Sequence, residues 1–153
     1  REIEARESRE TNLVIAGLAE SGSDDIEVRK KNDSDAVLSC LHHVHPDISM
    51  EDIRGVYRTG KKNDDVNRPR LMVVRLRSTE MRSTILRSVC KPPGNVKVRA
   101  DLTKAEREAE IAFFQRLRAA EEENPGANFR VIGPPGKRRF LRVKQNDQVK
   151  EST

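Results

Sequence analysis

The chain has 153 residues, with 30 Lys or Arg, 25 Asp or Glu and 3 His, so its formal net charge is +5. This length suits one compact domain, or one domain with a small appendage. No apolar run approaches the roughly 18–20 residues of a membrane helix, which excludes a spanning segment in this sequence. Two cysteines, Cys40 and Cys90, are too few for a disulfide framework and predict an intracellular protein with reduced thiols.

The net charge conceals a segregation of charge along the chain. Residues 54–99 carry 13 basic and 3 acidic side chains, and residues 129–153 carry 7 basic and 2 acidic ones. Residues 1–53 and 100–128 are net acidic. Because ordinary surfaces intersperse the two signs, the basic segments predict a binding surface for a polyanion, most often nucleic acid.

The first hundred residues alternate between strand and helix patterns. Residues 1–11 are charged and favour helix, and we expect them to be the end of an upstream helix or coiled coil, since the chain starts like a fragment of a longer protein. The elements predicted next are a strand over 13–18, a helix that follows Asp24 and runs to about 44, strands over 53–58 and 70–76, a helix capped by Thr79 that ends near 90, and a strand over 96–99.

This β-α-β-β-α-β order is the split βαβ arrangement, and it predicts an α+β domain over residues 12–100. A small module over 101–145 follows. Its helix starts at Thr103, where Glu106 completes a capping box, and two strands over 129–132 and 140–143 form a hairpin. Residues 146–153 are a tail. Among the aromatic side chains of the module, we expect Phe113, Phe114 or both in the core and Phe129 and Phe140 paired across the hairpin.

The first strand, Leu13-Val14-Ile15-Ala16-Gly17-Leu18, resembles that of an RNA recognition motif. The aromatic position of the first strand falls on Val14, and the third strand has Leu71, Val73 and Arg75 on its open face instead of aromatic rings. We therefore do not expect bases to stack on aromatic rings as they do in that family, and we expect contacts with phosphates instead.

A narrower family is more similar. The segments that carry the resemblance are 12–20 (NLVIAGLAE), 57–61 (YRTGK), 68–76 (RPRLMVVRL) with the signatures that follow it at 79–81 and 85–87, and 98–103 (VRADLT). Over roughly residues 1–145 they are similar to the first-open-reading-frame protein of LINE-type (non-LTR) retrotransposons. The resemblance implies an upstream coiled coil that forms a homo-oligomer, a divergent RNA recognition motif and a small C-terminal domain. It also implies binding of single-stranded RNA or DNA, nucleic-acid chaperone activity, and a ribonucleoprotein in the cytoplasm or nucleus.

Candidate RNA-binding residues come from this resemblance and from the charge pattern. The resemblance places Arg58, Arg68, Arg70, Arg75, Arg87 and Arg99 at basic positions of the family's RNA-binding surface. The charge pattern adds the loop residues Lys61 and Lys62 and the hairpin residues Lys137, Arg138 and Arg139. Arg58 and Arg75 come from neighbouring strands, and we expect them to share the open face. Tyr57 then points to the core, because neighbouring side chains on a strand alternate.

Other motifs predict little chemistry. The donors Cys40, His42, His43 and His45 lie near a helix end without a second cluster, so we predict no metal. The carboxylate pairs Asp24–Asp25 and Asp64–Asp65 lack a His partner, so we expect neither an enzyme nor a cofactor. The alternative function is a protein–protein interaction module of the same fold that binds no RNA.

Overall fold

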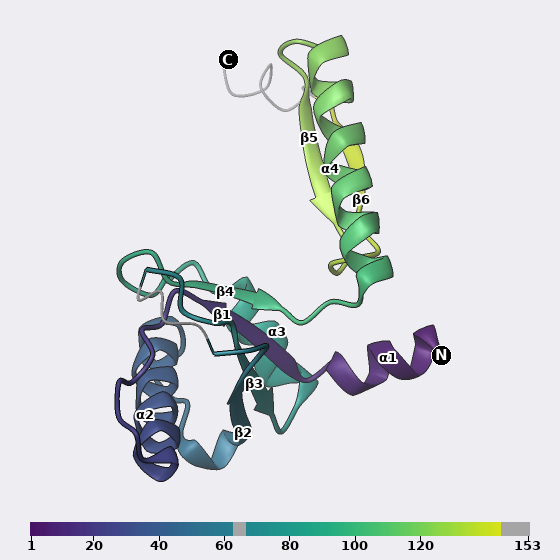
Figure 1. Ribbon diagram of the computed structural model, residues 1–153. Helices are drawn as coiled ribbons and strands as arrows, with labels where there is room; N and C mark the ends of the chain where they lie inside the picture. The colour runs from purple at the N-terminus through teal and green to yellow at the C-terminus, as the bar shows by residue number, and fades with distance from the viewer. Residues whose placement is uncertain (63–66, 145–153) are drawn as a thin grey trace, which may run out of the picture. The chain divides into compact units, whose positions relative to one another are not determined.

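The computed structural model describes residues 1–62 and 67–144 of an α+β protein (Figure 1). The tail expected at 146–153 and the pair Asp64–Asp65 lie outside the described residues. The chain divides into two compact units. One is Ile3–Asp101, and the other is formed by Leu102 onward together with Arg1–Glu2.

The first unit contains a four-stranded antiparallel sheet of order β2-β3-β1-β4. Its elements in chain order are α1 (Glu2–Arg9, which begins in the other unit), β1 (Asn12–Ala16), α2 (Ile26–Val44), a 3-10 turn (Met50–Asp52), β2 (Ile53–Arg58), β3 (Met72–Leu76), α3 (Thr79–Arg87) and β4 (Lys97–Ala100). The predicted order of strands and helices is confirmed.

The core lies between one face of this sheet and the helices α2 and α3. Inward positions alternate along the strands, so Leu13 and Ile15 of β1 pack beside residues of β3. The side chains of the core cluster that are fully buried are Leu13, Ile15, Val37, Leu41, Met72, Val74 and Leu76. The core helices α2 and α3 lie on one side of the sheet, and the opposite side is called the open face below.

The helix ends differ slightly from the predicted ones. Asp25, rather than Asp24, caps α2 by accepting a hydrogen bond from the Glu27 amide at 2.9 Å. Ser78, rather than Thr79, caps α3, which ends at Arg87 instead of near residue 90. Each cap satisfies an amide that the first helical turn leaves without a partner.

An irregularity in β2 decides which side chains face outward. Ile53 pairs with Leu76, and the next pair is Gly55 with Arg75, so Arg54 is an extra residue in β2. Such a β-bulge inverts the alternation for every residue after it. As a consequence, Tyr57 pairs with Val73 on the open face and Arg58 shares a face with the core.

The second unit is a helix packed on a hairpin. It contains α4 (Lys104–Glu123), β5 (Asn128–Ile132) and β6 (Arg139–Val143). The capping box predicted at the start of α4, with Thr103 and Glu106, is confirmed. Phe113 is 2% exposed, and its ring lies 5.9 Å from that of Phe140, which lies 5.5 Å from that of Phe129. The expected pairing of rings across the hairpin is therefore confirmed. In the described residues, no helix is both long and apolar enough to cross a membrane.

Candidate nucleic-acid interface

The open face of the sheet is basic. The strand pairing places two rows of side chains on it: Tyr57, Val73, Val14 and Arg99 in one row across the four strands, and Gly55, Arg75 and Asn12 in the next. Lys97 pairs with Ala16 on the same face. The four strands, all within the described chain, place no acidic side chain on this face.

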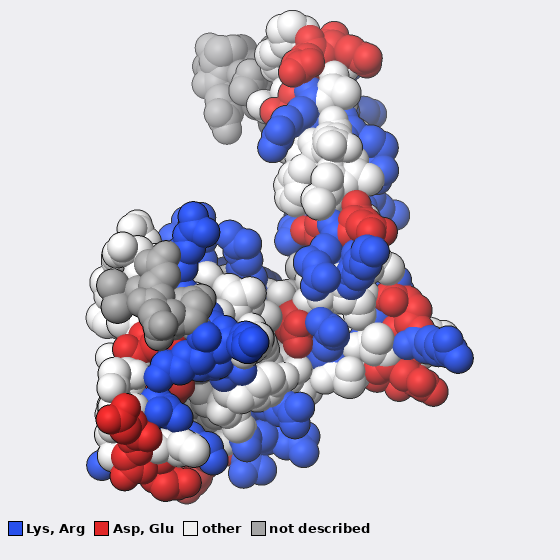
Figure 2. All heavy atoms as spheres, in the orientation of Figure 1, with Lys and Arg blue, Asp and Glu red and all other residues white. Residues whose placement is uncertain are grey.

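Three of these cations are available to a ligand. Arg75, Lys97 and Arg99 are exposed, and among the described residues none of them lies within ion-pair distance of a carboxylate. Figure 2 shows basic side chains gathered over the loops and strands beside α2, while acidic ones gather over the lower part of α2. Guanidinium and ammonium groups in such a field bind phosphates and release counterions from the nucleic acid.

Tyr57 also belongs to the open face. Its side chain is 42% exposed, and the Arg75 guanidinium carbon lies 5.3 Å from the centre of its ring. A cation–π contact at an exposed site contributes about 0.5–1 kcal/mol. The expectation that Tyr57 packs in the core is wrong, because the bulge at Arg54 reverses the faces of β2.

Arg58 does not share the open face with Arg75, and this expectation is also wrong. The side chain of Arg58 is 5% exposed and points to the helix side of the sheet, where Nη2 lies 3.0 Å from Asp33 of α2. Its guanidinium also donates hydrogen bonds to three carbonyl oxygens, those of Leu18 and Arg70 from Nη1 at 2.7 and 2.9 Å and that of Ala19 from Nη2 at 2.9 Å. All these acceptors are groups of the protein itself, and Arg58 uses them to link the β1–α2 connection to the β2–β3 connection.

Arg70 has a similar structural partner. Its Nε donates a hydrogen bond to Glu20 Oε1 at 2.9 Å, and its Nη2 lies 2.8 Å from the same oxygen. The backbone amide of Arg70 donates to Glu20 Oε2 at 3.1 Å. Burial alone would raise the pKa of Glu20, but the hydrogen bonds from Arg70 and the charges of Arg70 and Arg58 together lower it below its ordinary value. The carboxylate is thus ionised and neutralises Arg70 in place.

The remaining predicted residues lie in three places. Lys61, Lys62 and Arg68 are exposed in the β2–β3 connection, next to undescribed residues 63–66. Arg87 is exposed at the end of α3, in the helix layer behind the sheet, and so does not lie on the open face.

In the second unit, Arg138 contacts Glu110 through Nε at 3.0 Å to both carboxylate oxygens, and its guanidinium lies 5.7 Å from the centre of the Phe114 ring. Lys137 and Arg139 are exposed beside it. Arg138 therefore holds the hairpin turn to α4, and its two neighbours are the cations there that remain accessible.

Two of the four donors near the end of α2 have other roles. Cys40 lies in the core, and burial raises the pKa of its thiol to about 11. The His42 ring forms a 2.7 Å hydrogen bond with the carbonyl oxygen of Ile48. Within the described residues, no three His, Cys, Asp or Glu side chains come together as a metal site would require.

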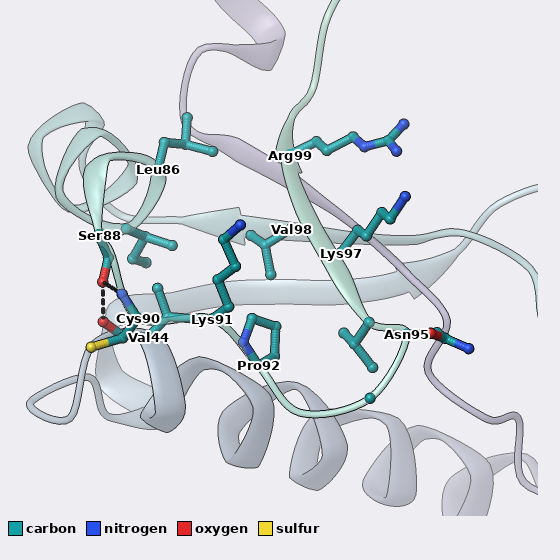
Figure 3. A pocket seen from close by; sticks show the side chains of 13 residues that line it. Val44, Leu86, Ser88, Cys90, Lys91, Pro92, Asn95, Lys97, Val98 and Arg99 are labelled. Carbon is teal, nitrogen blue, oxygen red and sulfur yellow. Dashed lines mark hydrogen bonds between the residues drawn. The ribbon is translucent and has the colours of Figure 1, made fainter.

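A cleft of about 450 Å³ lies beside β4, between the end of α3 and the segment 88–95 (Figure 3). Leu86 and Val98 form part of its apolar lining, and Lys91 extends into it. Lys97 and Arg99 of β4 also line the cleft, and the strand pairing places their side chains toward the open face. The cleft and the open face therefore adjoin at β4, which is an edge strand.

Two residues of the open face were not predicted as site residues. Lys97 lies two positions from Arg99 in a strand, and strand alternation places both on one face, so its position could have been predicted. Tyr57 could not have been placed without the bulge, for which the only local signal is Gly55 inside an apolar strand pattern.

No protein-family model matches this sequence, and no curated protein shows significant similarity to it.

Proposed function

We propose that this chain binds single-stranded nucleic acid, mainly RNA, through a sheet arranged as in an RNA recognition motif. The observation that carries the proposal is the open face, on which Arg75, Lys97 and Arg99 are exposed and not paired with carboxylates among the described residues. The strand order β2-β3-β1-β4 and the element order support the assignment of the fold.

The binding we propose tolerates different sequences. Asn12 is the one amide side chain that the four described strands place on the open face. It is 4% exposed and donates its hydrogen bonds to Asp101 and to the Ser8 carbonyl. The exposed polar side chains left on the strands of this face are cations and the Tyr57 hydroxyl, and cations bind the phosphates that every sequence presents. The resemblance to retrotransposon first-open-reading-frame proteins supports a role in coating a transcript as a nucleic-acid chaperone.

The experiment is a titration of labelled single-stranded RNA at several salt concentrations. We expect the logarithm of the association constant to fall linearly with the logarithm of the salt concentration, by about 0.7 per phosphate contacted. The variant Arg75→Gln/Lys97→Gln/Arg99→Gln should lower this slope by about 2. Oligonucleotides of unrelated sequence should lose affinity equally.

The matched control is Lys30→Gln/Lys31→Gln/Arg87→Gln, which removes the same charge from exposed positions of α2 and α3 on the helix side. It should change affinity through net charge alone and leave the slope nearly as it is. If the wild-type chain does not bind, or binds with no salt dependence, the proposed function is wrong.

A second candidate is a module that binds an extended peptide, favoured by the apolar cleft next to the edge strand β4. It is supported if oligonucleotides do not bind at low salt while an extended peptide that is apolar and acidic shifts the amide resonances of Val96 and Val98.

A further inference from the structure

The chain contains one Tyr and no Trp, and that Tyr lies on the open face of the sheet. Tyr57 lies on β2, at the opposite edge of the sheet from β4. Its ring is 42% exposed and is contacted by the guanidinium of Arg75 at 5.3 Å. Cross-strand packing against Val73 explains why part of the Tyr57 ring is covered, but it leaves the exposed part of the ring without a role.

The surroundings of Tyr57 are those of a single-strand binding platform. The ring shares its face with Arg75, Lys97 and Arg99, and aromatic rings set among cations are the usual means of binding unpaired nucleotides. Tyr57 and Arg99 stand in one row, three strand spacings apart, which is about 14 Å. A single strand of nucleic acid that crosses the sheet along this row can therefore place a base against Tyr57 and a phosphate against Arg99.

We propose that the ring of Tyr57 stacks against one unpaired nucleobase, an inference that rests on the proposed function. The base takes the place of the Arg75 guanidinium on the ring, and Arg75 turns to a neighbouring phosphate. The exchange is favourable because the guanidinium replaces an exposed cation–π contact with a charge-assisted hydrogen bond. Every base has a π-face, so this contact adds affinity without selecting a sequence.

The single Tyr makes the test direct, because intrinsic fluorescence excited in the aromatic band reports on Tyr57 alone. The wild-type chain is titrated with a short oligouridylate and, separately, with an abasic ribose-phosphate oligomer of the same length. We expect the oligouridylate to quench the Tyr emission as it binds. The abasic oligomer should bind more weakly through its phosphates and leave the emission unchanged.

Two variants separate the ring from the rest of the surface. Tyr57→Phe keeps the ring and should bind the oligouridylate within about twofold of the wild type. Tyr57→Leu keeps an apolar side chain without a π-face and should bind about tenfold more weakly. Its salt slope should stay the same, since the phosphate contacts are retained.

The possible outcomes distinguish the two proposals. If both oligomers bind, the emission does not change and Tyr57→Leu binds like the wild type, the stacking inference is wrong and the phosphate surface stands. If neither oligomer binds at low salt, the proposed function itself is wrong. Because the ring is partly exposed, a melting curve of each variant should show that the fold is retained.

Discussion

We expect the replacement of Arg58 to lower the stability of the fold and to leave the RNA-binding surface unchanged. The Arg58 side chain is 5% exposed, and the side chain of its partner Asp33 is 18% exposed. Arg58→Ala leaves that carboxylate and three carbonyl oxygens without their donor. Breaking a buried ion pair by removing one partner costs about 3–5 kcal/mol. Since Asp33 keeps some contact with water, we expect the lower end, about 3 kcal/mol.

The assay is thermal or urea unfolding followed by circular dichroism. For a unit of about 100 residues, 1 kcal/mol corresponds to about 4–8 °C in the melting midpoint, so Arg58→Ala should lower the midpoint by at least about 12 °C. Arg58→Lys keeps the charge but not the planar group with several donors, and its midpoint should be intermediate.

The control for this prediction is Arg75→Ala, which removes an exposed guanidinium from the neighbouring strand. It should cost less than about 1 kcal/mol, because its contact is an exposed cation–π pair. The reasoning is refuted if Arg58→Ala melts with the wild type and loses RNA affinity instead, since Arg58 would then be part of the interface.

Three further predictions concern single side chains. The ionised Glu20 contributes its full stabilisation above its ordinary pKa of 4.5, and this contribution is lost as the pH falls through the lowered pKa. The free energy of unfolding should therefore decrease over that pH range. In a plot of the urea midpoint against pH, Glu20→Gln should make this decrease smaller. A thiol reagent should modify exposed Cys90 rapidly and buried Cys40 only on unfolding, so Cys90→Ser should abolish the fast phase. Gly17→Ala should lower stability by about 1–3 kcal/mol in the same urea titration, because φ is +95° and a Cβ would lie 2.8 Å from the Asn95 carbonyl oxygen; an unchanged midpoint would contradict the geometry.

The elements of the fold could be predicted from the sequence because they depend on local chemistry. The apolar run at 13–16, the alternation in 72–76, the capping residues and the breaks at Pro and Gly are each visible within a few residues. The capping box at Thr103 and Glu106 was predicted to the residue because both partners lie within one helical turn.

The faces of β2 could not be predicted by the same reasoning. Alternation starting from Ile53 as an inward residue places Tyr57 inward and Arg58 outward, which is opposite to the structure. The bulge at Arg54 depends on how β2 pairs with β3, and this pairing joins residues about twenty positions apart. One extra residue therefore exchanges the roles of an aromatic ring and a guanidinium.

Counting charges along the chain overestimates the number of cations that can bind phosphates, because the acidic segment 1–53 pairs with some of them. With 3 acidic residues among residues 54–99, the 13 cations there cannot all be paired within the segment. In the folded chain, however, Glu20 and Asp33 from the acidic segment reach Arg70 and Arg58. Folding thus uses part of the basic segment to hold the sheet connections in place. Cations left for a phosphate lie on the open face, where the described residues offer no carboxylate to Arg75, Lys97 or Arg99. We therefore expect the measured salt slope to follow the few accessible cations and to be far smaller than the basic count of the sequence implies.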